Sequence, residues 1–330
     1  MNPLIQALPG ITLSVPDVTR QLSEMWSVEW SVASSSHSQE RASQLNIVIH
    51  LGLETTEREA QKIFTDTVTF AQRHPCRIIV LCPMKQAEPS KQAFDAKLYS
   101  SCFIGENLRK QCYCEALILG YSVNEPENLQ NQLTLWLETD LPIYYWFHKV
   151  EPHRIINHYL RFSKMVSRVI YDSAIEGDAY QKIDWPRNDM LSDLATARIL
   201  VIRQSIGQFL SGYPISQLAE KLNAILISHS TKYFAEAHCL GKWVNYCLKD
   251  FALPSPINSQ ISPVSQQDYD LGLDFHYHDQ KIIQWRYQAE KNQGSTKTNI
   301  GSSEKESTIL LRTLRPDEAL SEALFFGRKP

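Results

Sequence analysis

Strand-like segments alternate with amphipathic helical segments along the first half of the chain, and this alternation restricts the fold more than any other feature. Residues 45–51 (LNIVIHL) have the length and the apolar content of a buried strand. Residues 55–73 place an apolar stripe on one helical face, and residues 77–81 (RIIVL) repeat the strand pattern. Strands separated by helical crossovers predict a layered α/β fold, with a mixed, mostly parallel sheet and helices on both faces.

The alternation continues to residue 171 with one exception. The strand patterns of residues 98–104 and 112–121 follow each other without a helix between them, which predicts a hairpin or an antiparallel edge in the sheet. The remaining elements expected in this half are helices at 126–138 and 153–165 and strands at 141–147 and 168–171.

The second half predicts a smaller α/β (α+β) domain. It starts with a long helical pattern at residues 191–210, which Gly212 and Pro214 end. Polar stretches at 252–267 and 290–307 are interpreted as loops. The other elements expected here are a strand at 224–228, a helix at 233–248, strands at 269–277, 281–287 and 308–313, and a helix from Pro316.

The expected domain organisation has three parts. Residues 1–43 form an N-terminal helix (17–30) and a Ser-rich linker (33–43). Residues 44–186 form the α/β domain, and residues 187–330 form the second α/β domain. The total length of 330 residues fits two domains better than one.

Composition and charge exclude several classes of function. Lys and Arg (33) nearly balance Asp and Glu (36), so there is no net positive field for nucleic acid or an anionic membrane. Apolar runs are much shorter than the ~20 residues that span a bilayer, and the first 15 residues lack the pattern of an export signal. Seven cysteines, an odd number, fit reduced thiols. We therefore expect a cytoplasmic protein.

No specific enzyme motif is present. The sequence lacks the glycine-rich GxGxxG and GxxxxGK[ST] phosphate-binding turns, as well as G-x-S-x-G, H-E-x-x-H and C-x-x-C. We expect neither a catalytic centre nor a cofactor.

Cys112 and Cys114, in the strand segment at 112–121, are the most conspicuous pair of reactive groups. Cys112 and Cys114 share one face of a strand, about 6.6 Å apart, which is too far for an unstrained disulfide between them. Either could pair across strands with Cys102 or Cys82 as a thiol switch. The alternatives are small buried side chains without a redox role, or a metal site.

Two pairs of histidines have a spacing that could bind metal. His276 and His278 share a strand face, but a third ligand is not evident. His229 and His238 flank the start of a predicted helix. Exposed or structural histidines are the other reading of both pairs, and we expect no metal.

The strand at 141–148 (LPIYYWFH) is unusually aromatic. Alternation places Ile143, Tyr145 and Phe147 on one face and Tyr144 and Trp146 on the other, so both faces need burial or a partner. Core packing and a recognition surface both remain open as explanations.

Charged residues near the predicted elements suggest ion pairs or an anion site. Arg198 and Arg203 lie beside the apolar stripe of the helix at 191–210, and a half-buried arginine requires an anionic partner, for which Asp140 and Asp172 are candidates. With Arg77, these two aspartates form a candidate anion or ion-pair cluster.

The carboxyl ends of the predicted parallel strands define a candidate ligand crevice. Cys82, His148 and Asp172 fall at these ends, which are the usual ligand site of an open α/β sheet. This feature favours an alternative function, a sugar-phosphate- or nucleotide-binding α/β enzyme or sensor.

Four sequence blocks stand out between residues 74 and 198: HPCRIIV (74–80), DLPIYYW (140–146), RVIYDS (168–173) and DLATAR (193–198). In their order and spacing they resemble the glucose-6-phosphate dehydrogenase assembly protein family (OpcA-type). The resemblance covers approximately residues 45–210.

The resemblance implies a non-catalytic protein that binds glucose-6-phosphate dehydrogenase and favours its active oligomer, as an allosteric activator. Such a protein supports NADPH production by the oxidative pentose phosphate pathway. In photosynthetic members the family is linked to redox control, which adds thioredoxin as a candidate partner of Cys102, Cys112 or Cys114. For the partner interface or its support we select Tyr144, Trp146, Arg198 and Arg203.

Overall fold

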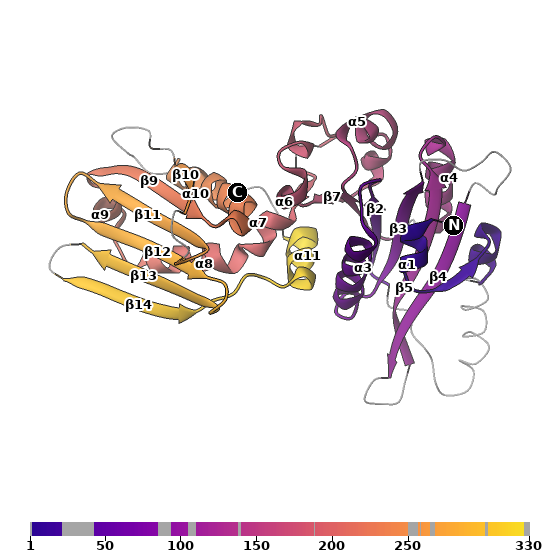
Figure 1. Ribbon diagram of the computed structural model, residues 1–330, viewed down its shortest axis with the longest axis horizontal. Helices are drawn as coiled ribbons and strands as arrows, with labels where there is room; N and C mark the ends of the chain where they lie inside the picture. Colours follow the sequence, from indigo (N-terminus) through magenta and orange to yellow (C-terminus); the bar gives the residue numbers. More distant parts are fainter. Residues whose placement is uncertain are drawn as a thin grey trace. The chain divides into compact units, whose positions relative to one another are not determined.

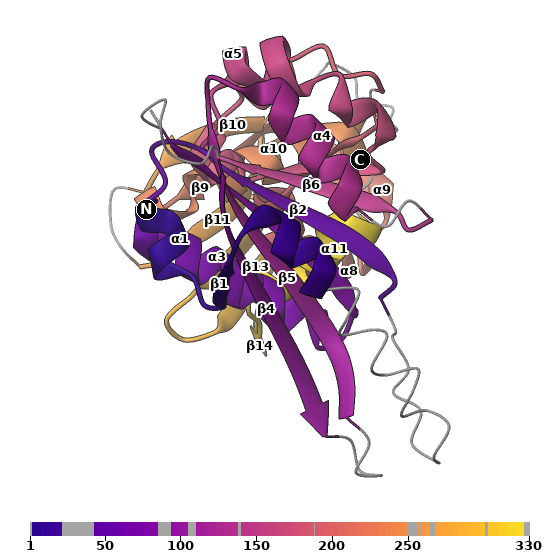
Figure 2. The ribbon, with the colours of Figure 1, turned by 90° about the vertical axis from the view of Figure 1, so that its right-hand side faces the viewer.

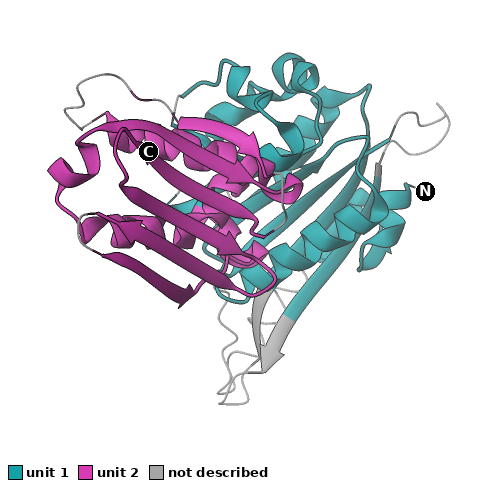
Figure 3. Cartoon of the chain, turned by 60° about the vertical axis from the view of Figure 1, so that its left-hand side comes forward, with its two compact units in different colours: residues 1–192, 323–326 teal, residues 193–322, 327–330 magenta. Residues whose placement is uncertain are grey.

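The computed structural model divides into two compact units. It describes residues 2–21, 43–84, 94–104, 110–137, 140–187, 189–249, 257, 259–264, 268–300 and 303–326. Unit 1 comprises residues 1–192 with 323–326, and unit 2 comprises residues 193–322 with 327–330 (Figure 3).

Unit 1 contains an eight-stranded sheet among its described residues, and Figure 1 shows its elements. The strand order is β1-β4-β5-β3-β2-β6-β7-β8. The pairs β5-β3, β3-β2, β2-β6 and β6-β7 are parallel, whereas β4 is antiparallel to both β1 and β5. The predicted mixed, mostly parallel sheet with an antiparallel edge is therefore confirmed. The strands are β1 (Ile11–Leu13), β2 (Leu45–Leu51), β3 (Cys76–Met84), β4 (Phe94–Ile104), β5 (Lys110–Ser122), β6 (Ile143–His148), β7 (Arg168–Tyr171) and β8 (Leu191–Asp193).

Helices cover both faces of this sheet (Figure 2). The helix α3 (Glu57–Ala71) begins with a capping box between Thr56 and Glu59, and it buries Phe64 and Phe70 against one face. On the other face, α4 (Pro126–Trp136) and the segment 152–165 pack on Tyr145 and Phe147 in a single hydrophobic core. Every residue of β2 is buried, as expected of a parallel strand between two helical layers.

The segment 152–165 is a broken helix, unlike the single helix predicted for 153–165. It consists of α5 (Pro152–Arg154), a π-helical turn at Ile155–Tyr159 and a 3₁₀ turn at Phe162–Met165. The wider π turn carries Tyr159 into the core, where it is 5% exposed.

Further differences from the prediction lie in the N-terminal region and between β7 and β8. The short α1 (Pro3–Ala7) and β1 were not expected, and the helix predicted for 17–30 is described only over residues 15–21. Its remainder and the linker at 33–42 lie outside the described residues. After β7, α6 (Ser173–Glu176) and a 3₁₀ turn at Tyr180–Lys182 lead to β8.

The predicted long helix at 191–210 is wrong at its start. Residues Leu191–Asp193 form the edge strand β8, and the Asp193 carboxylate accepts a hydrogen bond from the Ala195 N–H (3.0 Å), which caps α7 (Leu194–Arg198). Ile199 then separates α7 from α8 (Leu200–Ser211). An N-cap aspartate three residues into an apolar pattern therefore shifts the start of the helix.

Unit 2 contains a six-stranded sheet with the order β10-β9-β11-β12-β13-β14 among its described residues. Only the β10-β9 pair is parallel. The core lies between this sheet and the helices α8 and α10, with Trp285 donating to Ser205 Oγ (3.2 Å). The elements are α9 (Ile215–Ala219), β9 (Leu222–His229), a 3₁₀ turn (Thr231–Tyr233), α10 (Phe234–Leu248), β10 (Ser259–Pro263), β11 (Leu271–Tyr277), β12 (Ile282–Gln288), β13 (Gln293–Asn299), β14 (Glu304–Leu310) and α11 (Pro316–Phe325).

The polar stretches predicted as loops contain strands. β10 lies within 252–267, and β13 with most of β14 lies within 290–307. Their composition is polar because most of these side chains are at least partly exposed, and all seven residues of the edge strand β14 are exposed. Charged residues such as Lys305 and Glu306 are typical of a sheet edge that must not pair with other chains.

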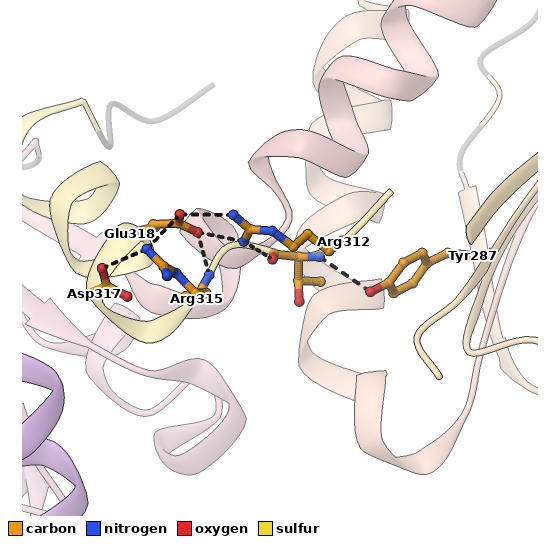
Figure 4. Close-up of polar contacts among 6 residues, drawn as sticks. Tyr287, Arg312, Arg315, Asp317 and Glu318 are labelled. Atoms are coloured by element: carbon orange, nitrogen blue, oxygen red, sulfur yellow. Dashed lines mark hydrogen bonds and ion pairs between the residues drawn. The ribbon is translucent and has the colours of Figure 1, made fainter. Parts of the chain in front are cut away.

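The start of α11 is fixed within unit 2 by charged side chains (Figure 4). Arg312 donates to both carboxylate oxygens of Glu318 (2.7 and 3.0 Å), and the Arg315 N–H donates to Glu318 as well (2.9 Å). The Arg312 hydrogen bonds contribute most to lowering the pKa of Glu318 to about 2. Nearby, the Thr313 N–H donates to the Tyr287 hydroxyl (3.3 Å).

Candidate functional site

The carboxyl ends of the parallel strands of unit 1 are the position where an open α/β sheet binds its ligand. The strand order reverses at β2, which has β3 on one side and β6 on the other, and such a switch point is the expected crevice. The structure places the predicted residues Cys82, His148 and Asp172 at this edge.

Two backbone loops meet at the switch point and close it. The Gly52 N–H after β2 donates to the His148 carbonyl at the end of β6 (2.7 Å). A Cβ atom at Gly52 would lie 1.6 Å from the Lys149 carbonyl oxygen, so only glycine fits there. Lys149 itself has φ 56°, in the left-handed region that costs a non-glycine residue about 1 kcal/mol or more.

Lys149 is held in this strained conformation by two carboxylates. Its ammonium contacts both oxygens of Glu59, at 2.7 and 2.9 Å, in the first turn of α3. Its backbone N–H donates to Glu176 Oε1 (2.7 Å) on α6. Burial has the largest single effect on Glu59 and raises its pKa, but the hydrogen bonds from Lys149 and Thr56 and the Lys149 charge together outweigh it and lower the pKa to about 2. Burial raises the pKa of Glu176.

A buried histidine with two tyrosine partners lies beside this closure. The His50 ring is fully buried, with Nδ1 2.8 Å from the Tyr145 hydroxyl and Nε2 2.5 Å from the Tyr121 hydroxyl. The Tyr159 hydroxyl is 3.3 Å from that of Tyr121. Burial, with a further contribution from the Arg154 charge, lowers the pKa of His50 to about 3. The ring is therefore neutral at physiological pH and can accept only one of the two hydroxyl protons.

The space around this cluster is small. The cavity lined by His50, Tyr121, Tyr159 and Arg154 has a volume of about 10 Å³, which accommodates one water molecule at most. A neutral, enclosed histidine without room for a substrate has the geometry of a structural hydrogen-bond network.

A larger open groove lies beside the first turn of α3. Its volume is about 1090 Å³, and its lining includes Leu4, Leu53, Thr55 and Arg58. Thr55 Oγ1 is buried and has no hydrogen-bond partner among the described residues. The His148 Nε2 atom is likewise unpartnered within that part of the chain, and burial lowers the pKa of His148 to about 4.

The structure does not bring Arg77 and Asp172 together. Arg77, near the start of β3, donates to Glu115 through Nε (3.2 Å) and Nη2 (2.9 Å), and to the Trp136 carbonyl (3.0 Å). Asp172 follows the end of β7 and caps α6. By register the two positions are roughly 16 Å apart along the strand direction and roughly 14 Å apart across the sheet. The exposed Asp140 precedes β6, at the amino-end edge.

The residues selected for a partner interface are largely internal. Tyr144 and Trp146 are 9% and 7% exposed, and Tyr144 packs edge-on against Phe325, which belongs to unit 1. In unit 2, Arg198 pairs with Glu236 (2.8 Å). Arg203 is half-buried, and burial lowers its pKa.

Backbone register separates the cysteines into two groups. Cys114 lies opposite Cys76 across β5 and β3; both are buried, and burial raises the pKa of Cys76 well above its usual range. Cys102 and Cys112 are directly opposite each other across β4 and β5, although their side chains lie outside the described part of the structure. Cys82 is also buried, which raises its pKa.

The candidate metal-binding histidines do not form a metal site among the described residues. His276 and His278 are exposed, and no group of three potential ligands occurs in this part of the chain. In the second pair, His229 Nδ1 contacts the Ser230 carbonyl (3.1 Å) and His238 Nδ1 contacts the Phe234 carbonyl (2.9 Å).

Sequence reasoning missed the residues that dominate the crevice. The capping box at Thr56 and Glu59 was readable from the sequence, as was the single glycine, Gly52, after a strand. The partner of Glu59 was not, since Lys149 is 90 residues away along the chain.

In the described ranges, no helix is both long enough and apolar enough to span a membrane.

Comparisons with known structures show a likeness of fold. Glucose-6-phosphate 1-dehydrogenase from Mycobacterium avium matches with a TM-score of 0.51 and 9% identity, over 87% of this chain and 88% of that one. The Gal80p super-repressor mutant from Saccharomyces cerevisiae (TM-score 0.40, 8% identity) covers 85% and 84% of the two chains. Aldose-aldose oxidoreductase from Caulobacter crescentus (TM-score 0.41, 11% identity) covers 87% and 91%.

Sequence comparison identifies a family. No curated protein sequence matches the chain. Residues 67–184 match the family model described as "Glucose-6-phosphate dehydrogenase subunit N-terminal domain". This range contains the first, second and third sequence blocks in full, whereas the fourth (193–198) lies beyond it. Over residues 67–184 the chain therefore matches the model of the family that its sequence blocks resemble, the glucose-6-phosphate dehydrogenase assembly family (OpcA-type).

Proposed function

We propose that this protein is a non-catalytic partner of glucose-6-phosphate dehydrogenase that binds the enzyme and favours its active oligomer. The family match over residues 67–184 carries this proposal. Through the dehydrogenase, the protein would support NADPH production by the oxidative pentose phosphate pathway in the cytoplasm.

The chemistry of the crevice supports a non-catalytic role. His50 is the residue best placed for acid–base chemistry, but it is buried, neutral and bonded to two tyrosines. The first turn of α3 carries Glu57 and Glu59, and their charges oppose the binding of a phosphate at this helix start.

An activator of this kind must bind the active conformation of the dehydrogenase more tightly than the inactive one, because equal affinity shifts no equilibrium. Tyr144 and Trp146 are buried, so their proposed contribution is to support the surface above them. Arg198 and Arg203 would contribute in the same way to α7 and α8. The contacting surface is formed by other, exposed side chains.

The direct test combines binding and kinetics. The purified full chain is mixed with glucose-6-phosphate dehydrogenase from the same cell, and the complex is followed by size-exclusion chromatography with light scattering. We expect a complex of defined mass and a lower apparent KM or a higher kcat of the dehydrogenase. Absence of both the complex and the kinetic effect refutes the proposal.

Redox control is a subsidiary part of the proposal. The register places Cys102 opposite Cys112, a pairing compatible with a cross-strand disulfide that thioredoxin could reduce. Mild oxidation followed by peptide mass spectrometry should give a Cys102–Cys112 disulfide and leave Cys76 and Cys114 as thiols. If the C102S/C112S variant retains any redox dependence of dehydrogenase binding, this part of the proposal is wrong.

The groove beside α3 favours the alternative, a sugar-phosphate- or nucleotide-binding enzyme or sensor. Its volume suits a small ligand, and Arg58 with the unpartnered Thr55 hydroxyl offers polar contacts. A ligand that binds the folded chain, in the absence of any partner enzyme, stabilises it by RT ln(1 + [L]/Kd) and so raises its melting temperature. A panel of sugar phosphates and nucleotides that produces no saturable shift excludes this alternative.

A further inference from the structure

A dinucleotide is held at three points in a doubly wound sheet. These are a glycine-rich turn after the first strand, the start of the following helix, and the end of the second strand, where an acidic side chain bonds the ribose. In unit 1 the corresponding elements are the turn 52–56, α3 and the end of β3. In unit 1, residues of the chain itself occupy each of these points.

The first two points are occupied from the β6 side. The Lys149 carbonyl lies against Gly52 so closely that no pyrophosphate fits between the two loops. The Lys149 ammonium then binds Glu59, where a phosphate would face the helix. A cation and a carboxylate of the chain therefore replace an anionic ligand at the start of α3.

The third point is occupied from the N-terminal side. The Asn2 amide, 2% exposed, donates to the carbonyls of Cys82 (3.0 Å) and Pro83 (3.1 Å) at the end of β3. Ile5 is fully buried against Gly120, where a Cβ atom would lie 2.4 Å from Ile5 Cδ1.

Further contacts hold this N-terminal segment in place. The Lys97 ammonium donates to the Leu8 carbonyl (2.7 Å), and Gln61 on α3 donates to the Ala7 carbonyl (3.0 Å). We call residues 2–8 the N-terminal strap.

We propose that Lys149 and the N-terminal strap form a lock, in which the chain's own residues take the three contact positions of a dinucleotide; the groove beside the first turn of α3 stays open next to them. The lock joins segments from distant parts of the sequence: the strap, the turn 52–56 and the end of β6. This inference rests on the contacts of unit 1 and not on the proposed dehydrogenase partner.

The test measures the lock directly by amide hydrogen exchange of the full chain. The variants K149M and E59Q each remove the Lys149–Glu59 ion pair, and the control K62M removes the exposed pair of Lys62 with Asp66 on the same helix. We expect exchange at residues 52–56 and 148–150 to accelerate by about tenfold or more in K149M and E59Q, and to be unchanged in K62M. E59Q keeps the size of the side chain, so it tests the ion pair even if K149M folds poorly.

The strap is tested separately with N2A. This variant removes the two bonds to the end of β3, and we expect faster exchange at residues 82–84 without a change at residues 148–150. Equal exchange in N2A and the unmodified chain overturns the role of the strap. Equal exchange in E59Q and K62M overturns the role of the ion pair.

A ligand experiment completes the test. Titration of the unmodified chain with NADP⁺ or NAD⁺, up to about 5 mM, should leave its melting temperature unchanged, since the chain's own residues already take the contact positions of a dinucleotide. A saturable rise overturns the lock. Capture of the dehydrogenase, measured on the same preparations, reports on the proposed function independently, so either conclusion can fail alone.

Discussion

Replacing Glu115 with Gln keeps the shape of the side chain and removes the negative charge that Arg77 faces. The two side chains are 2% and 9% exposed, and Nη2 of Arg77 lies 2.9 Å from Glu115 Oε2. Loss of the Glu115 charge takes a carboxylate away from the buried guanidinium, and breaking a buried pair in this way typically costs about 3–5 kcal/mol. For a unit of this size, that loss lowers the melting temperature by roughly 6–20 °C.

The assay is urea unfolding followed by tryptophan fluorescence, because the buried Trp136 accepts a hydrogen bond from Arg77 and reports on this region. A double-mutant cycle uses E115Q, R77M and the pair R77M/E115L. We expect the pair to be far less destabilised than the sum of the single variants, since a buried ion pair can be replaced by apolar groups at little cost. The surface variant K62M should change stability by less than about 0.5 kcal/mol.

A cost of less than about 1 kcal/mol for E115Q would refute this reasoning, as would additive effects in the cycle. The outcome also separates two roles of Arg77. An arginine that serves as an anion site would lose ligand binding on substitution and leave the fold nearly unchanged.

Three further predictions follow from the buried and exposed groups. The pKa of His50 falls from 6.5 to about 3 on folding, so its contribution to stability is complete above pH 6.5 and is lost as the pH falls toward 3. H50F should therefore flatten the dependence of urea stability on pH in that window. At pH 7 the same variant should cost about 1–3 kcal/mol, because it leaves the tyrosine hydroxyls that bond His50 unsatisfied. The pKa of Glu318 is lowered to about 2, so its contribution is present above pH 4.5 and is lost toward pH 2, and R312M should reduce this acid dependence in thermal scans. Leu135 in unit 1 and Leu310 in unit 2 are 73% and 90% exposed. We expect L135R to weaken capture of the dehydrogenase more than L310R, because the family match lies in unit 1. The opposite order would place the contact in unit 2.

The sequence was sufficient to predict the layered α/β fold because the strands of unit 1 are buried on both faces. The segment 45–51 is apolar along its whole length, and the alternation of Tyr145 and Trp146 correctly assigned them to opposite faces of β6. The same signal is absent from 293–299 and 304–310, which form strands β13 and β14 near the edge of the sheet of unit 2 and carry mostly polar, solvent-exposed side chains. Periodicity therefore identifies elements that contribute to a core and misses those that extend a sheet into water.

The site could be predicted only in part, and the reason is the distance between its members. The ends of β3, β6 and β7 were placed correctly, because parallel strands must finish at one edge. The contents of that edge depend on contacts such as Asn2 with Cys82 and Lys149 with Glu59, which join segments far apart in the sequence. No local pattern encodes such pairs, nor does one encode the π turn that carries Tyr159 into the core.

The first turn of α3 carries charges that differ from those that a phosphate ligand requires. Acidic residues at a helix start stabilise the helix by about 0.3–1 kcal/mol each, and Glu59 adds both a capping box and the bond to Lys149. A sheet that binds a dinucleotide must leave this position free for phosphate, and it obtains that stability only when the ligand is present. For a protein whose proposed role is to present a rigid surface, permanent stability at this position is the better solution. The likeness of fold to a dehydrogenase is therefore compatible with the close contact of Gly52 with Lys149 at this edge.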